Sequence, residues 1–382
     1  MHAIVKEKQD NVGYEFPFEG EKHLATAVIL PYREDTWREK AKPALDEYFE
    51  VVKAISQYEK VLLIADPAID YHILTRFQLK NVTFFRHKTD DSWARDTLPV
   101  FLRNKDGYLL GVDYGFNSWG GDYNGLYFPY DNDNNLGKEL LLDLSISRFA
   151  DKDFILEGGS IHTDGEGTLL TTECCLLSKG RNPKLNRKQI EEHLKKTLNQ
   201  DKVIFLPFGI YEDETSGHID NICCFLEPGA VLLAYCDDQE DPQYLMSRKD
   251  YEVLSQETDS KGRKLKIIKM PLPKPLYLTE EESQGIVEDK NAIERKAGRR
   301  LAASYVNCYI GETYVLLPQF GVEEDKIAFD ILAEFYRGKK TIIPIRSREI
   351  LLGGGNIHCI TKQIPFSDLY EIESTEDSEC KK

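Results

Sequence analysis

Residues 217–235 read GHIDNICCFLEPGAVLLAY and contain the clearest strand–turn–strand signal in the chain. Two apolar runs, rich in β-branched and aromatic side chains, flank the turn sequence Glu227-Pro228-Gly229. The same arrangement recurs in residues 93–112, 158–172 and 304–317. A fifth stretch, GGGNIHCIT from residue 353, is similar to the openings at residues 158 and 217. This repetition predicts a fold built from about five equivalent units.

Helical patterns lie between the hairpins, and each is followed by a short apolar strand. The predicted helices cover Asp35–Tyr58, Leu185–Asn199 and Asp325–Tyr336, and the strands begin at Val61, Val203 and Thr341. The repeated order of hairpin, helix and strand predicts an α/β ring. In this ring each hairpin begins near one central axis, and the last unit lies against residues 93–96. No Ser/Gly or Pro/Gln linker interrupts the chain. We therefore expect one catalytic domain over residues 1–382, with a solvated acidic tail at about 367–382.

Composition narrows the classes of partner. The chain has 49 Lys and Arg against 65 Asp and Glu, a formal net charge of −16. This excess disfavours nucleic acid, whose phosphates require basic patches, and it attracts small cations. No apolar run approaches the roughly 18–20 residues that cross a bilayer, and the start MHAIVKEKQD lacks a signal-peptide core. We expect a cytoplasmic protein without membrane association, whose eight cysteines are mostly reduced core residues.

Polar side chains recur where the predicted units open. They are Trp93 and Asp96, Glu157 and His162, His218 and Asp220, and His358 and Cys359. If residues 217–220 form a strand, His218 and Asp220 point to the same face. On a strand His358 would point away from Cys359, so we expect His218 to be the general base. Each residue alone has a structural explanation, and the prediction depends on their recurrence at equivalent points.

One thiol, one imidazole and several carboxylates suit attack on a guanidinium. A thiolate is a strong nucleophile, but nearby carboxylates raise the pKa of a thiol. A cationic substrate removes this conflict, because carboxylates accept a guanidinium bidentately and the bound cation favours the thiolate. Cys359 is the predicted nucleophile, and Asp96 and Asp220 are predicted to bind the guanidinium. His218 is predicted to transfer protons, and Glu157 to orient His218. Gly354 and Gly355 are predicted to leave space for the planar cation.

Motifs over nearly the whole chain resemble those of the agmatine deiminases, of the guanidine-modifying pentein superfamily. They include SWARDTLPV (92–100), FNSWGG (116–121), EGGSIHTDGEGTLLTTECCLL (157–177), RNP (181–183), DETSGHIDN (213–221), SYVN (304–307) and GGGNIHCITKQIP (353–365). The family's catalytic cysteine, histidine, two guanidinium-binding carboxylates and EGG glutamate fall on Cys359, His218, Asp96, Asp220 and Glu157. Lys362 departs from the pattern, because family members usually read Gln-Gln at 362–363.

The resemblance implies a five-bladed α/β propeller of ββαβ units with pseudo-five-fold symmetry. It also implies hydrolysis of agmatine to N-carbamoylputrescine and ammonia through a covalent amidino-cysteine, with no metal or organic cofactor. A homo-oligomer, a dimer or tetramer, is a further family-level expectation.

The far end of agmatine carries only an amine, so its site should lack a basic clamp for a carboxylate. Glu212, Asp213 and Glu214 supply negative charge beside GHID, and Glu214 is our first choice for the amine. Trp93 and Trp119 would wall the methylene chain, with cation–π contacts at either end. Arginine and peptidyl-arginine remain alternative substrates.

Two other classes of function stay open. The pairs His162-x-Asp164 and His218-x-Asp220, together with His358, could be ligands of a metal-dependent amidinohydrolase. A non-catalytic polyamine-binding protein could use the same carboxylates without any chemistry at Cys359.

Overall fold

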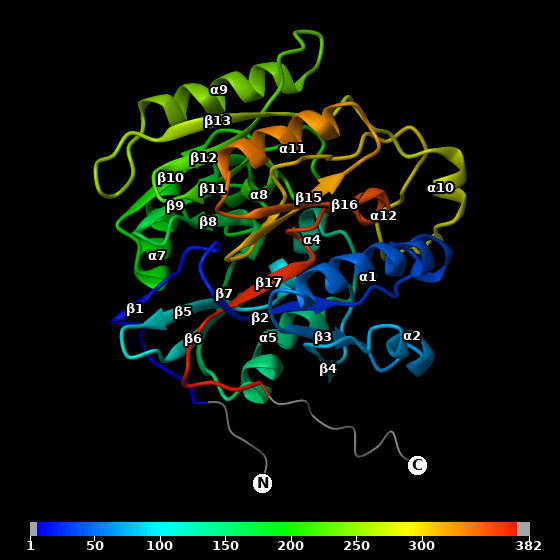
Figure 1. Cartoon of the computed structure of the whole chain (residues 1–382), viewed down its shortest axis with the longest axis horizontal. Coiled ribbons are helices and arrows are strands. Elements are labelled where there is room, and N and C mark those ends of the chain that lie inside the picture. The colour runs from blue at the N-terminus through cyan, green and yellow to red at the C-terminus, as the bar shows by residue number, and fades with distance from the viewer. Residues whose placement is uncertain (1–5, 373–382) are drawn as a thin grey trace.

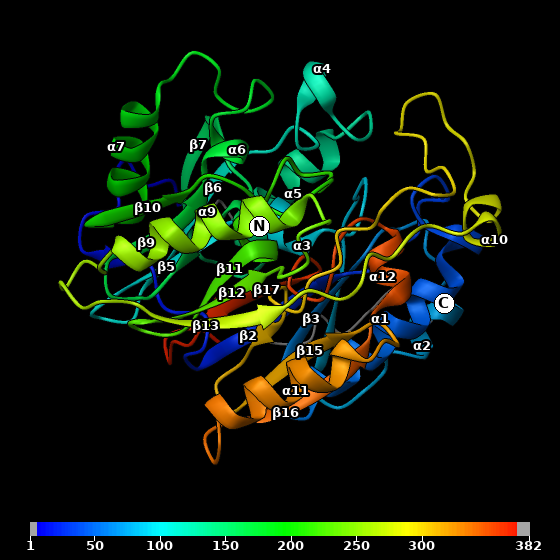
Figure 2. The same cartoon turned by 90° about the horizontal axis from the view of Figure 1, so that it is seen from above.

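The computed structural model describes residues 6–372, whose strands form five separate sheets (Figure 1). Every sheet contains an antiparallel pair of strands, followed after a crossover helix by a strand that runs parallel to the second member of the pair. In one sheet a further strand adds a second antiparallel pair. The five crossover helices are α1 (Lys42–Ser56), α5 (Asp131–Asp143), α7 (Arg187–Leu198), α9 (Gln243–Gln256) and α11 (Glu324–Phe335). In Figures 1 and 2 the helices α1, α7, α9 and α11 lie outside the sheets.

Two of the sheets have four strands. One has the order β17-β2-β3-β4 and contains β17 (Thr361–Pro365), β2 (His23–Ile29), β3 (Val61–Ala65) and β4 (Val82–Arg86). The other has the order β1-β5-β6-β7 and contains β1 (Tyr14–Glu15), β5 (Val100–Asn104), β6 (Leu109–Gly115) and β7 (Ser147–Ile155).

The other three sheets have three strands each. One contains β8 (Ile161–Thr163), β9 (Thr168–Thr172) and β10 (Lys202–Leu206). The next contains β11 (Cys223–Glu227), β12 (Ala230–Tyr235) and β13 (Lys266–Pro271). The last contains β14 (Tyr309–Ile310), β15 (Tyr314–Gln319) and β16 (Thr341–Arg346). Short helices complete the chain: η1 (Arg38–Ala41), α2 (Tyr71–Thr75), α4 (Gly121–Asn124), α6 (Glu173–Leu176), α10 (Glu280–Gln284) and α12 (Arg348–Leu352).

One sheet is assembled from both ends of the chain. Strand β17 pairs antiparallel with β2, with Thr361 opposite Val28 and Gln363 opposite Thr26. Next to this pair, the backbone N–H of Arg95 donates to the carbonyl of Cys359 at 3.0 Å. The prediction that the last unit closes onto residues 93–96 is therefore confirmed.

A helical turn, rather than a strand, precedes the first strand of several units. These turns are α3 (Ala94–Thr97), η2 (Gly158–Ser160) and α8 (Ile219–Ile222). The prediction of a strand through GHID is wrong, because β11 begins only at Cys223 and the His218 N–H is held by the Asp213 carboxylate at 3.1 Å. Residues 357–360 likewise form turns before β17. Polar groups at the openings are thus placed by helical turns and not by the two-residue period of a strand.

The predicted hairpins and the three predicted helices and strands are confirmed, with boundaries shifted by a few residues. The helix predicted from Asp35 begins only at η1 and continues as α1. Helices α5 and α9 and their following strands were not predicted, because their hydrophobic faces are narrow: α9 fully buries only Leu254 among its apolar side chains. The buried strands are nearly continuous apolar runs, such as VLLIA in β3, which is typical of parallel strands covered on both faces.

The seven cysteines of the described region are free, and six of them are buried. Cys380 and most of the predicted acidic tail lie outside the described residues. Among residues 6–372, no helix combines the length and the apolar character that a membrane span requires.

Candidate active site

The helical turns at the unit openings bring polar side chains together. Asp96 lies in α3, Glu157 precedes η2, and Asp220 lies in α8. The Oδ1 atom of Asp96 accepts a hydrogen bond from the Gly159 N–H at 2.8 Å, which joins two of the turns directly. A Cβ at Gly159 would lie 2.6 Å from His218 Nδ1 and 2.9 Å from Asp220 Oδ2, so this close approach requires glycine.

Cys359 is buried, with 6% of its surface exposed. Its Sγ accepts a hydrogen bond from Asn307 Nδ2 at 3.2 Å and lies 3.9 Å from Asp220 Oδ2. Burial, followed by the charges of Asp220 and Asp96, raises the pKa of the Cys359 thiol well above its usual value. The thiol is therefore neutral in the empty site, and a nucleophilic thiolate requires an additional positive charge nearby.

His218 lies between two carboxylates and is 1% exposed. Its Nδ1 is 3.8 Å from Asp96 Oδ2, and its Nε2 is 3.7 Å from Glu157 Oε2. Burial alone would lower the pKa of His218, but Asp96, Cys175 and Glu157 outweigh it, and the pKa is raised well above its ordinary value. Nδ1 lies on the side of Asp96 and Asp220, so an imidazolium here can deliver its Nδ1 proton to a group held between these carboxylates.

Glu157 is held by Arg181. The distance from Arg181 Nε to Glu157 Oε1 is 2.8 Å, and both side chains are fully buried. Burial would raise the pKa of Glu157, but Arg181 and His218 outweigh it and hold the pKa at about 2. Glu157 therefore stays ionised and stabilises the charged form of His218.

The two carboxylates assigned to the guanidinium differ in their surroundings. Trp119 Nε1 donates to Asp96 Oδ2 at 2.9 Å, and burial raises the pKa of Asp96. Asp220 Oδ2 is 2.8 Å from His358 Nδ1, while Asp220 Oδ1 has no partner in the described region. Burial would raise the pKa of Asp220, but His358 and His218 outweigh it and lower the pKa. Asp220 therefore offers a charged, free oxygen.

A cleft of about 450 Å³ leads to Cys359. Its lining includes Trp93, Trp119, Glu214, Gly354, Asp96 and Cys359. The rings of Trp93 and Trp119 meet edge to face with centroids 6.3 Å apart. This geometry gives the cleft aromatic walls and a carboxylate-rich end, which suits an elongated cation.

Known proteins resemble this chain over most of its length. The family model of the Porphyromonas-type peptidyl-arginine deiminases matches residues 15–365. The chain belongs to this family.

Its members include close relatives of the chain. A Listeria monocytogenes protein provisionally named agmatine deiminase 1 is 46% identical over 354 residues, which is 92% of this chain and 97% of that protein. The Enterococcus faecalis agmatine deiminase structure is 37% identical with a TM-score of 0.91, covering 96% of this chain and 99% of that one. A cysteine-to-serine variant of the C. jejuni agmatine deiminase, with substrate bound, is 30% identical with a TM-score of 0.80, covering 94% and 99%. The resemblance read from the motifs, and the α/β fold of the pentein kind, are thereby confirmed.

The structure gathers most of the side chains that the sequence singled out around this cleft. Cys359, His218, Glu157, Asp96 and Asp220 form one cluster. Trp93, Trp119 and Gly354 line the cleft. Gly355 lies behind its wall, where a Cβ would be 2.4 Å from the Trp93 ring and 3.1 Å from Cys359 Sγ.

One expectation about the surroundings of the site is wrong. His358 was expected to point away, but its ring contacts Asp220, because residues 357–360 are turns and not strand. The site was expected to lack a basic clamp for a carboxylate, and one basic side chain, Arg295, lines the cleft. The guanidinium of Arg295 is already engaged, since it donates to both carboxylate oxygens of Glu214 at 2.8 and 3.0 Å and to the carbonyls of Leu352 and Gly353.

Three further residues at the site were not predicted. Asn307 and Arg181 stand in the motifs SYVN and RNP, but nothing in the sequence assigns them a contact. Glu19 lies 2.7 Å from His358 Nε2 although 339 positions separate the two residues. Of the three, Asn307 was the easiest to predict from the sequence, because an amide side chain inside a buried motif requires hydrogen-bond partners.

Within residues 6–372, two groups of side chains place possible metal-ligand atoms close together: Glu19, His162 and His358, and Glu157, Cys175 and His218. Each has a buried cation beside it, since Arg95 is 3.2 Å from Glu19 and Arg181 is 2.8 Å from Glu157. Of the ligands expected for a metal enzyme, His162 and His358 fall in one group and His218 in the other, so they do not share one site. Asp164 instead accepts hydrogen bonds from the backbone of Glu166 and Thr168 in its own turn.

Proposed function

We propose that the protein hydrolyses agmatine to N-carbamoylputrescine and ammonia through a covalent amidino-cysteine. The observation that carries the proposal is a convergence of three groups in one cluster beside the cleft: the buried thiol of Cys359, the free Oδ1 of Asp220 and the imidazole of His218. The matched relatives named as agmatine deiminases support the choice of agmatine.

In the first half of the reaction, Asp96 and Asp220 bind the guanidinium from two sides. The cation offsets their charge beside Sγ, so the pKa of Cys359 falls and its proton passes to solvent water. The thiolate attacks the guanidinium carbon and forms a tetrahedral adduct. His218 then gives its proton to the departing nitrogen, the C–N bond breaks, and ammonia leaves a thiouronium cation on Cys359.

In the second half, neutral His218 accepts a proton from water as the water oxygen attacks the thiouronium carbon. The C–S bond breaks with its electron pair on sulfur, the hydroxyl proton of the adduct passes to Sγ, and the ureido product leaves. Glu157 stays ionised throughout and stabilises each imidazolium state of His218. Asn307 donates to Sγ and stabilises the thiolate both as nucleophile and as leaving group.

The amine end of agmatine is assigned to the outer part of the cleft, and Glu214 is our candidate for it. Its charge is shared with Arg295 and Arg299, at 2.8 and 3.1 Å. Both carboxylate oxygens of Glu214 already accept from Arg295, so we expect it to contribute less than Asp220 does. Glu214→Gln should raise KM for agmatine with little change in kcat, and an unchanged KM removes Glu214 from substrate binding.

The deciding experiment is a side-by-side assay of agmatine, arginine and a peptidyl-arginine for ureido product and ammonia. We expect turnover of agmatine and little of the other two. Comparable kcat/KM for arginine contradicts the proposal. In rapidly quenched wild type, mass spectrometry should find an amidino adduct on Cys359, and an adduct on Cys308 instead would overturn the assignment.

The two rival classes make different predictions. A metal-dependent amidinohydrolase loses activity in EDTA and recovers it with zinc, whereas we expect no loss in EDTA and agmatine-protected inactivation by iodoacetamide. A non-catalytic polyamine-binding protein releases no ammonia, and its Cys359→Ser variant behaves as wild type. In our proposal that variant still binds agmatine but releases no ammonia.

We further propose that the five sheets form the blades of a propeller with pseudo-five-fold symmetry, as one catalytic domain over residues 1–382. The repeated ββαβ order and the pairing of β17 with β2 support this arrangement. We also propose a cytoplasmic homo-oligomer, a dimer or tetramer, that binds neither nucleic acid nor membrane. Sedimentation equilibrium tests the oligomeric state, and a monomer contradicts it.

A further inference from the structure

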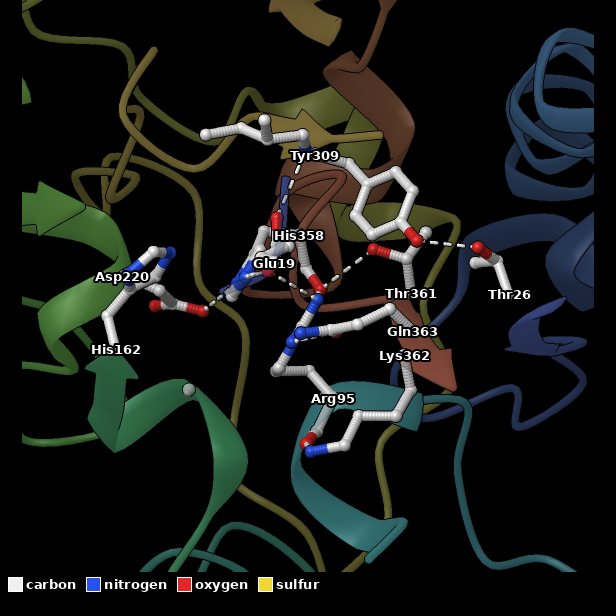
Figure 3. Close-up of polar contacts among 12 residues, drawn as sticks. Glu19, Thr26, Arg95, His162, Asp220, Tyr309, His358, Thr361, Lys362 and Gln363 are labelled. Atoms are coloured by element: carbon white, nitrogen blue, oxygen red, sulfur yellow. Dashed lines mark hydrogen bonds and ion pairs between the residues drawn. The ribbon is translucent and has the colours of Figure 1, made fainter. Parts of the chain in front are cut away.

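A row of buried side chains with alternating charge leads away from Asp220 (Figure 3). His358 lies between two carboxylates, with Nδ1 2.8 Å from Asp220 Oδ2 and Nε2 2.7 Å from Glu19 Oε2. Arg95 follows, with Nη2 3.2 Å from Glu19 Oε2. Each of the four side chains is at most 4% exposed, so solvent screens none of these charges.

The contacts of His358 define its charge. An ionised carboxylate only accepts hydrogen bonds, so two carboxylates at the two ring nitrogens require two N–H donors. A neutral imidazole has only one, and His358 is therefore an imidazolium. Burial and Arg95 lower the pKa of His358, but Glu19 and Asp220 outweigh them and raise it. With both nitrogens engaged, His358 has no free atom for a substrate proton or a metal.

The main chain and the ring of His358 have separate supports. Its backbone N–H donates to Asn307 Oδ1 at 2.9 Å, and its carbonyl accepts from Arg95 Nε at 3.2 Å. Glu19 in turn accepts from the Ile310 N–H through Oε1 at 3.0 Å. Replacing the ring therefore leaves the hydrogen bonds that place the neighbouring Cys359 in the turn.

We propose that His358 is a positioning residue: a permanently charged imidazolium that keeps Asp220 ionised, fixes its Oδ2, and leaves its Oδ1 free for the guanidinium. Glu19 holds the imidazolium, and Arg95 holds Glu19. The inference rests on the proposed function, because it assigns Asp220 to the substrate. It gives a role to two side chains, Glu19 and His358, that never touch the substrate.

The sign of the effect on Asp220 follows from electrostatics. A neutral side chain at position 358 removes the cation between the buried carboxylates of Asp220 and Glu19. The repulsion between these carboxylates then favours protonation of Asp220. A protonated or misplaced Asp220 binds a guanidinium poorly. At the same time the repulsion between Asp220 and the Cys359 thiolate weakens, so the thiol itself should not lose reactivity.

The test compares His358→Gln, Glu19→Gln and His162→Gln with wild type. His162 is the matched control, because its ring centroid is 6.0 Å from that of His358 but burial lowers its pKa to about 4, so it adds no charge to the row. Its Nδ1 accepts from the Phe225 N–H. We expect kcat/KM for agmatine to fall about 100-fold in His358→Gln, the typical cost of a misplaced reacting geometry. Glu19→Gln should lose about 10-fold, and His162→Gln should stay close to wild type.

Iodoacetamide labelling of Cys359 distinguishes positioning from a general structural role. A disturbed fold lowers labelling and turnover together, whereas loss of positioning lowers turnover and leaves labelling at or above the wild-type rate. Full activity of His358→Gln in an active wild-type background overturns the inference. Absence of ammonia release by wild type itself overturns the proposed function instead, so the two failures are distinguishable.

A second measurement decides the matter if His358→Gln does not fold. In wild type with ¹⁵N-labelled histidine, NMR should show a ring that keeps both protons well above pH 6.5, the ordinary pKa of histidine. In Glu19→Gln the same resonance should lose its proton at lower pH. A wild-type His358 that titrates near pH 6.5 overturns the inference.

Discussion

Removing the charge of Asp220 should change turnover and thiol reactivity in opposite directions. In Asp220→Asn, the guanidinium loses its free carboxylate oxygen, so agmatine turnover falls. Breaking one partner of a buried charge pair costs about 3–5 kcal/mol, and we expect kcat/KM to fall at least ~100-fold. The Cys359 thiolate, in contrast, loses a repulsive neighbour.

The size of the second effect follows from one distance. Sγ of Cys359 and Oδ2 of Asp220 are 3.9 Å apart, and two unit charges near that separation repel by about 4 kcal/mol at an effective dielectric constant of about 20. This energy shifts the thiol–thiolate equilibrium by ~1000-fold. A more acidic thiol is also a weaker nucleophile, which removes a factor of ~20. Alkylation by iodoacetamide at neutral pH should therefore accelerate by ~30-fold or more.

The assay is the rate of iodoacetamide labelling at Cys359, followed by mass spectrometry, beside ammonia release from agmatine. Asp250→Asn is the matched control. Burial raises the pKa of Asp250 to about 8, so this carboxyl is largely protonated at neutral pH and asparagine replaces it without a change of charge. Slower labelling in Asp220→Asn than in wild type would refute the view that Asp220 suppresses the thiolate of the empty site.

Three other predictions concern single side chains. Arg181→Met removes the partner of buried Glu157, so the free energy of unfolding in urea should fall by about 3–5 kcal/mol. The control is Arg187→Met, at the half-exposed pair with Glu173, which should lower the free energy of unfolding by less than about 1 kcal/mol. Asn307→Ala removes the donor to Sγ, so kcat should fall ~10- to 100-fold and iodoacetamide labelling should slow, the reverse of Asp220→Asn. The raised pKa of Asp250 means that the folded state binds more protons than the unfolded state between about pH 4 and 8, so this group lowers stability as pH rises through that range. Asp250→Asn should therefore gain stability relative to wild type at pH 8 but not at pH 4, and parallel denaturation curves for the two proteins contradict this.

The sequence predicts the fold where the signal is local. A hairpin such as Cys223–Glu227 with Ala230–Tyr235 is specified by its turn residues and its β-branched runs, and it forms as expected. Helices α5 and α9 have a weaker apolar period, and α9 buries only Leu254 among its apolar side chains. Which sheet each strand joins depends on contacts between distant segments, and β17 with β2 is the extreme case.

The sequence predicted which residues belong to the site, but not how their side chains are arranged. Asp96, His218, Asp220 and Cys359 were found because they stand at equivalent points of a repeat. The strand assumed at the openings gave the wrong direction for His358, whose ring contacts Asp220. His218 and Asp220 do approach the same point, beside Gly159, although a helical turn and not a strand places them there. The place of Glu19 at the site could not be predicted from the sequence, because its contact with His358 depends on how two segments far apart in the chain pack together.

The pairing of β17 with β2 has a consequence for biosynthesis. Strand β2 leaves the ribosome long before β17, and the edge it offers to β17 stays unpaired until residues 361–365 have been made. An unpaired edge is a template for other strands, and the exposed interval is longest for this sheet. Premature termination before Thr361 leaves a product without its closing strand, which we expect to aggregate, to recruit chaperones, or to be degraded. The pocket therefore cannot assemble before the segment that carries Cys359 and β17 has been synthesised.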